Sequence, residues 1–72
     1  MRVRKIARVA NVLPQAVLHY SRIGLLQPNW DPDTGDQVFP HRQLIRLRLI
    51  SRAQKRGWSV DDIERRLPVL DP

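Results

Sequence analysis

Residues 20–28 read Tyr-Ser-Arg-Ile-Gly-Leu-Leu-Gln-Pro, and this stretch carries the clearest structural signals of the chain. Gly24 is a stop for the helix before it, because glycine readily takes the left-handed backbone conformation that ends helices. Leu25 and Leu26 follow as apolar contacts, and Pro28 leads the chain away from the helix. The stretch therefore predicts the end of one short helix and the beginning of an extended segment.

Upstream of this stretch, the sequence predicts two short helices. An apolar stripe at i, i+3, i+4 and i+7 predicts a helix over residues 3–10, formed by Val3, Ile6, Ala7 and Ala10. Asn11 tolerates the left-handed conformation and is a plausible stop. Pro14 is suited to the first position of a second helix, which reaches about Arg22. Two short helices joined by about three residues have helix-turn-helix spacing, so we expect this motif over residues 3–23.

Downstream, the sequence predicts a small ribbon and two more helices. Residues 31–36 contain Pro32 and Gly35 and favour a tight reversal. The flanks, 26–30 and 37–39, are expected to pair as a two-stranded wing over residues 26–39. A third helix is expected over 40–56, stopped by Gly57. A fourth is expected over 59–67, capped by Ser59 and ended or bent at Pro68.

Length and composition exclude several function classes. The chain has 72 residues, no cysteine and two histidines, so a disulfide framework is impossible and a structural zinc site is improbable. No apolar run approaches the roughly 20 residues that cross a bilayer. The sequence has no nucleophile–base pair, phosphate-binding loop or metal-spaced cluster. We therefore expect a cytoplasmic protein that is not an enzyme, needs no cofactor and has no membrane partner.

The formal net charge of +6 is concentrated in two blocks. Residues 1–30 carry five basic and no acidic side chains, and residues 41–60 carry six basic and no acidic ones. The three carboxylates of residues 31–40 separate these blocks. Such an arrangement favours a basic face that binds a polyanion. The alternative is an ordinary solvated surface.

The order of these elements resembles the DNA-binding domain of the MerR family of transcription regulators. The residues that carry the resemblance are Ile6-Ala7, Val12, the run 20–28, Gly35, Phe39, residues 44–47, Ile50 and residues 56–63. The resemblance implies a mainly α fold. It is a winged helix-turn-helix with four helices and a small two-stranded wing between the second helix and the third helix. It implies a single domain over residues 1–72. It also implies sequence-specific binding of double-stranded DNA, in transcription control or in an excisionase-type module.

The resemblance also suggests which residues contact DNA. In this fold the second helix enters the major groove, so Gln15 and Ala16 are expected near base edges, with His19 as a further contact. Backbone contacts are expected from helix cations and from the wing: Arg4, Lys5, Arg8, Arg22, Gln37, Arg42 and Arg46. Tyr20 is expected either to donate to a phosphate or to pack its ring under the wing. Family DNA sites are two half-sites, so a homodimer or a partner protein is also expected.

Two departures from the family pattern keep a second function open. Residues 18–20 are Leu-His-Tyr where the family usually has Arg-Tyr-Tyr, and Gln37 stands where the wing usually has an arginine. The carboxylates of the wing loop would repel phosphates. Chaperone-modulator proteins that bind J-domain co-chaperones resemble MerR domains and lack these DNA contacts. The alternative is therefore a protein-interaction module on the same fold, to which an exposed Trp30 would contribute.

Overall fold

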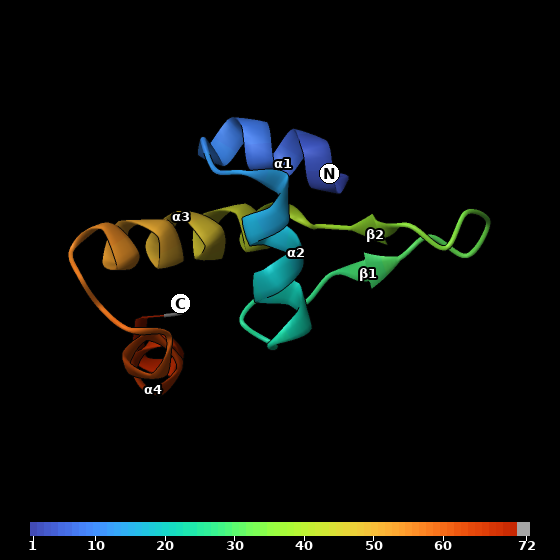
Figure 1. Cartoon of the computed structure of the whole chain (residues 1–72). Helices are drawn as coiled ribbons and strands as arrows, with labels where there is room; N and C mark the ends of the chain where they lie inside the picture. Colours follow the sequence, from blue (N-terminus) through green and yellow to red (C-terminus); the bar gives the residue numbers. More distant parts are fainter. Residues whose placement is uncertain (71–72) are drawn as a thin grey trace.

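The computed structural model describes residues 1–70, with side chains through Leu67, and it has four helices and a two-stranded antiparallel sheet. The order is α1 (Val3–Ala10), α2 (Pro14–Arg22), β1 (Asn29–Trp30), β2 (Gln37–Val38), α3 (His41–Lys55) and α4 (Val60–Leu70). In Figure 1 the sheet projects from one side of the helices, between α2 and α3 in the chain. The predicted mainly α, winged helix-turn-helix fold is therefore confirmed. Of the predicted domain, residues 71 and 72 lie outside the described residues.

The helix-turn-helix forms as its punctuating residues predict. Asn11 ends α1 with a left-handed backbone, φ 58°, and its N–H donates to carbonyl oxygens of the last turn. Pro14 occupies the first turn of α2, where a missing N–H costs nothing. The short turn sets α2 across α1, and the two helices contact each other along the motif.

The wing is shorter than expected, and its base belongs to the core. The predicted flanks included Leu26 and Phe39, but both side chains are buried in the helical core. The N–H of Gln27 donates to Gln43 Oε1 at 2.8 Å instead of to a partner strand. Pairing is therefore limited to Asn29 with Val38 and Trp30 with Gln37.

The first residues of the chain extend the wing along its other edge. Arg2 forms an isolated antiparallel bridge with Val38. The N–H of Phe39 donates to the carbonyl of Met1, and the Met1 amino group donates to the carbonyl of Phe39, both at 2.6 Å. These bonds hold the wing against the start of α1.

The last two helices follow the prediction closely, except at the end. The hydroxyl of Ser59 accepts from the N–H of Asp62, and the Asp62 carboxylate accepts from the N–H of Ser59, which is a reciprocal cap. The expected stop at residue 67 is wrong, because α4 continues through Pro68 to Leu70. Proline lacks one N–H donor, and at this position the loss affects a single hydrogen bond of the last turn.

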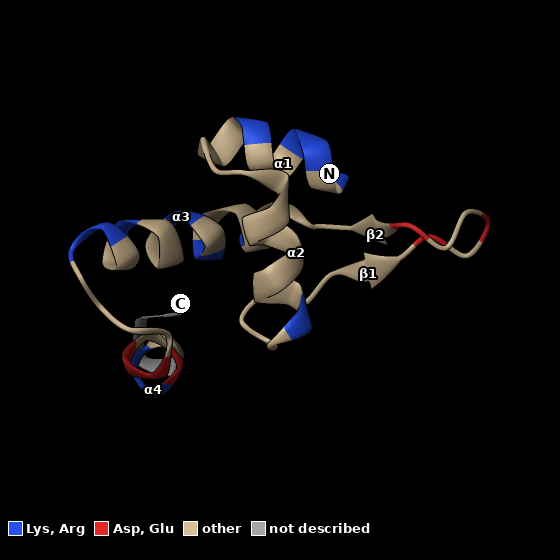
Figure 2. Ribbon diagram, viewed as in Figure 1, with Lys and Arg blue, Asp and Glu red and all other residues tan. Residues whose placement is uncertain are grey.

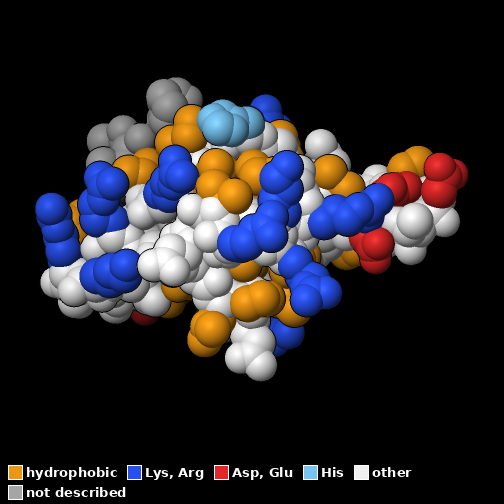
Figure 3. Space-filling model, turned by 90° about the horizontal axis from the view of Figure 1, so that it is seen from above, with side chains coloured by type: hydrophobic (Ala, Val, Ile, Leu, Met, Phe, Trp, Pro, Cys, Tyr) orange, Lys and Arg blue, Asp and Glu red, His pale blue; other side chains and the backbone are white. Residues whose placement is uncertain are grey.

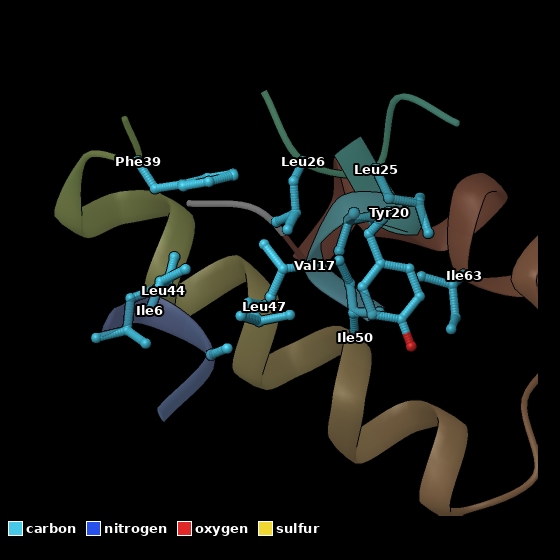
Figure 4. Close-up of a cluster of buried hydrophobic side chains, with 12 residues drawn as sticks. Ile6, Val17, Tyr20, Leu25, Leu26, Phe39, Leu44, Leu47, Ile50 and Ile63 are labelled. Carbon is cyan, nitrogen blue, oxygen red and sulfur yellow. The ribbon is translucent and has the colours of Figure 1, made fainter. Parts of the chain in front are cut away.

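The core is one apolar cluster to which all four helices contribute (Figure 4). Its fully buried members include Ile6, Val17, Leu26, Phe39, Leu47, Ile50, Ile63 and Leu67. Trp58 packs against this cluster just before α4, and the Arg66 guanidinium lies 4.6 Å from its ring centroid. The stripe that α1 was predicted to bury is confirmed by Ile6 and Ala7.

Candidate nucleic-acid interface

Helix α2 buries one face and presents the opposite face to solvent. Val17 and Tyr20 are buried, whereas Gln15, Leu18, His19 and Arg22 are exposed. The exposed residues follow the spacing i, i+3, i+4 and i+7, which places them on one side of a helix. This exposed stripe is the part of α2 that can meet a ligand.

An open groove runs between α1, α2 and the wing. Cationic side chains from residues 2–8 and from α2 line it: Arg2, Arg4, Lys5, Arg8 and Arg22. Its apolar lining includes Val12, Pro14, Leu18 and Trp30, and Gln37 lies at the wing side. The groove therefore combines a positive potential with apolar surface beside the exposed stripe of α2.

Among the described residues, the cations lie over the helices and away from the wing tip. Lysine and arginine are distributed over α1, α3 and the end of α2, the wing loop carries carboxylates, and α4 carries charges of both signs (Figure 2). Seen from the side of α1, cations extend across the molecule and the projecting wing tip is acidic (Figure 3). A basic face of this kind attracts polyanions at long range.

Arg2 binds the acidic loop of the wing. Its guanidinium lies 2.7 Å from Asp31 Oδ2 and 3.0 Å from Asp36 Oδ2. The pKa of Asp31 is held below its usual range, first by the hydrogen bond from the N–H of Asp33 and then by that from Arg2. The charge of two wing carboxylates is thus partly compensated. The sequence alone did not reveal this contact, because Arg2 lies about thirty residues away from its partners.

The comparisons with known proteins identify the family of the chain. A family model described as MerR HTH family regulatory protein matches residues 1–70. The chain belongs to the MerR family. The mercuric resistance operon regulatory protein of Bacillus cereus is 26% identical over 70 residues, which are 97% of this chain and 53% of that protein. The chain thus spans about half the length of this curated relative. No solved structure matches the chain significantly.

Within this MerR domain, Tyr20 is a core residue. Its exposed fraction is 7%, and its ring lies among Leu25, Ile50 and Ile63 (Figure 4). The hydroxyl donates to Gln54 Oε1 at 2.9 Å, and burial raises the pKa of the phenol. The expectation that this hydroxyl faces a phosphate is therefore replaced by a structural tie between α2 and α3. The sequence did contain a signal for this burial, because Tyr20 follows the apolar Val17 by three residues and residues i and i+3 share one face of a helix.

Arg46 is likewise engaged inside the MerR domain. Its Nε donates to the carbonyl of Leu25 at 2.6 Å, and the side chain is half-buried. This bond fixes the loop after α2 to α3. Arg42 is exposed at the start of α3, and neither arginine lines the groove. Both were expected to contact the DNA backbone. Arg2 is the arginine that the fold brings to the wing, and sequence reasoning missed it.

The remaining predicted residues divide between the groove and its edges. Arg4, Lys5, Arg8, Arg22 and Gln37 come together in the groove. Gln15 and His19 lie on the exposed stripe, and Ala16 is half-buried against the core. Trp30 is 64% exposed, so it is not folded onto the domain.

Within residues 1–70, the MerR domain contains no cluster of histidine and carboxylate side chains that could hold a metal ion. No helix in that part of the chain has the length and apolar character required to cross a bilayer.

Proposed function

We propose that this MerR-family chain binds double-stranded DNA sequence-specifically, with α2 in the major groove and the groove cations on the phosphate backbone. The observation that carries the proposal is the meeting of Arg2, Arg4, Lys5, Arg8 and Arg22 beside the exposed stripe of α2. Four of these cations lie in residues 2–8, and the fold places Arg22 of α2 beside them in the same groove. This convergence of positive charge favours a polyanion over an ordinary solvated surface.

The electrostatics of the groove favour a phosphate ligand. Asp36 is the carboxylate that lines it, and it is bound to Arg2. The other lining charges are positive. Each cation that neutralises a phosphate releases a condensed counterion, so affinity depends on the salt concentration. With four to six such contacts, a tenfold rise in salt is expected to weaken binding by about four to five decades.

The dimensions of α2 also fit the proposal. Its nine residues span about 13 Å, and a helix of this size enters the major groove of B-form DNA. Gln15 lies in the first turn, where recognition helices contact base edges. Transcription control is the role that the family description suggests, and a second half-site bound by a homodimer or by a partner protein would raise the affinity.

A titration of the full chain against a palindromic duplex pool at two salt concentrations tests the proposal. The expected result is tight binding at low salt and a steep loss at high salt. Arg8→Gln should weaken binding and flatten the salt dependence, whereas Arg52→Gln, outside the groove, is the matched control with little effect. A flat titration at low salt ends the proposal.

A second candidate function is a protein-interaction module of the chaperone-modulator type. The observation that favours it is apolar exposure around the groove, with Leu13 69% and Trp30 64% exposed. Large exposed aromatic side chains are typical anchors of protein interfaces. Titration of a J-domain protein, followed by isothermal titration calorimetry and repeated with Trp30→Ala, tests this alternative. Saturable binding that Trp30→Ala abolishes, together with no duplex binding, would favour it over DNA.

A further inference from the structure

Leu18 is an apolar side chain in a cationic setting. It is 43% exposed on the outer stripe of α2, and it lines the groove together with Arg8 and Arg22. A leucine can neither donate nor accept a hydrogen bond, so it has no favourable contact with a phosphate. Its exposure on the outer stripe of α2 leaves it available to an apolar feature of a ligand.

Thymine supplies such a feature in the major groove. Among the four bases, thymine is the one that presents a methyl group there, while the others present only donors and acceptors. We propose that Leu18 contacts a thymine methyl group and makes the domain selective for an A·T pair at that position. This inference rests on the proposed function and goes beyond it, because it assigns a base preference to a single side chain.

Gln15 extends the preference to the neighbouring base pair. It precedes Leu18 by three residues, which places it on the same face and about 4.5 Å away along the helix axis. One base-pair step of B-form DNA is about 3.4 Å. Glutamine pairs with the N6 and N7 edge of adenine through two hydrogen bonds. The half-site therefore contains two adjacent A·T pairs, one read through adenine and one through the thymine methyl.

The test uses the full chain and duplexes selected from a randomised pool at low salt. Each thymine of the selected duplex is replaced in turn by deoxyuridine, which removes the methyl group and changes nothing else. We expect a loss of about fourfold in affinity at one position of each half-site, the effect of one buried methyl group. Deoxyuridine at the other positions should leave the affinity unchanged.

Two variants assign the effect to Leu18. Leu18→Ala should bind the thymine and deoxyuridine duplexes equally, with the fold checked by circular dichroism. Ile45→Ala is the matched control, because Ile45 is 44% exposed on α3 and does not line the groove. It should retain the methyl discrimination. Gln15→Ala should also retain it, while the preference for adenine at the adjacent pair is lost.

The outcomes separate this inference from the proposed function. Tight, salt-dependent binding without a methyl effect at any position overturns the inference and leaves DNA binding standing. Discrimination that persists in Leu18→Ala overturns it as well. Failure of the wild-type chain to bind any duplex at low salt overturns both.

Discussion

Arg2 Nη2 lies 2.7 Å from Asp31 Oδ2, so the segment before α1 and the loop of the wing are joined by an ion pair. The same guanidinium also binds Asp36 through Nη1 at 3.0 Å. Arg2 therefore lines the groove as a cation whose charge is shared with two carboxylates. The attraction of the groove for a phosphate therefore depends on how far Asp31 and Asp36 neutralise the charge of Arg2.

Removal of the Asp36 charge should strengthen DNA binding. Asp36 lines the groove and is bound to Arg2, so Asp36→Asn removes one of the two carboxylates that pair with the guanidinium, and it removes one repulsion of phosphate. We expect a few-fold tighter duplex binding at low salt, measured by fluorescence anisotropy, and a smaller gain at high salt because of screening. Asp33→Asn, in the same loop but outside the groove lining, should change affinity less. An equal gain from both variants would contradict this role of Arg2.

The carboxyl group of Asp31 should titrate below the usual range of an aspartate. Its pKa is lowered first by the N–H of Asp33 and then by Arg2, so Arg2→Gln should raise it only part of the way back. Because the folded pKa is depressed, the group stabilises the fold above its unfolded pKa and loses this effect as pH falls through the folded pKa. Carbon-detected NMR of the Asp31 carboxyl measures its pKa in the folded wild type and in folded Arg2→Gln. A titration unchanged by Arg2→Gln would show that the ion pair is absent in solution.

Tyr20→Phe should lower stability without weakening DNA binding. The variant removes the 2.9 Å bond from the hydroxyl to Gln54, a loss of about 1 kcal/mol in the free energy of unfolding. Tyr20→Ala would instead create a cavity and cost about 3–5 kcal/mol. Denaturant melts measure both changes, and the duplex affinity of folded Tyr20→Phe should equal that of the wild type. A loss of duplex affinity in the folded Tyr20→Phe variant would show that the hydroxyl contacts DNA.

The ionisation of the Tyr20 hydroxyl at alkaline pH provides an independent test of its burial. Tyr20 is the only tyrosine, and burial raises its folded pKa. Its contribution to stability is therefore complete below the unfolded pKa and is lost as pH rises through the folded value. Ultraviolet absorbance should detect this late ionisation, and Tyr20→Phe should lack the corresponding fall in stability.

Arg8→Gln and Arg46→Gln should separate binding from folding. Arg8 is exposed in the groove, so its loss should reduce the slope of log affinity against log salt by about 0.9, with little change in stability. Arg46 is half-buried and donates to Leu25, so its loss should lower the melting temperature and leave the slope unchanged. If the slope of log affinity against log salt is equal for Arg8→Gln and the wild type, Arg8 does not contact a phosphate.

Ser59→Ala should weaken the start of α4. The hydroxyl of Ser59 accepts from the N–H of Asp62, and the loss of such a cap costs about 1 kcal/mol in the free energy of unfolding. Thermal melts measure the loss. Ser51→Ala, in the middle of α3, is a control that should be nearly neutral, since alanine favours helix. If the two variants melt alike, the cap contributes nothing to stability.

The sequence by itself determined the helices and their ends. Asn11, Pro14 and Ser59 act through backbone conformation and local hydrogen bonds, which depend on near neighbours, so their positions could be predicted closely. The acidic reversal between the strands was equally local. Pro68 was the exception, because one missing hydrogen bond near the end of a helix does not oblige it to stop.

Only the tertiary structure decided which side chains face the groove. Tyr20 and Arg46 looked accessible in sequence, yet long-range contacts to Gln54 and Leu25 turn one into the core and tie the other to a loop. Arg2 joined the site through carboxylates far along the chain. The physical reason is that burial and ion pairing depend on which elements pack together, whereas helix ends depend on a few consecutive residues.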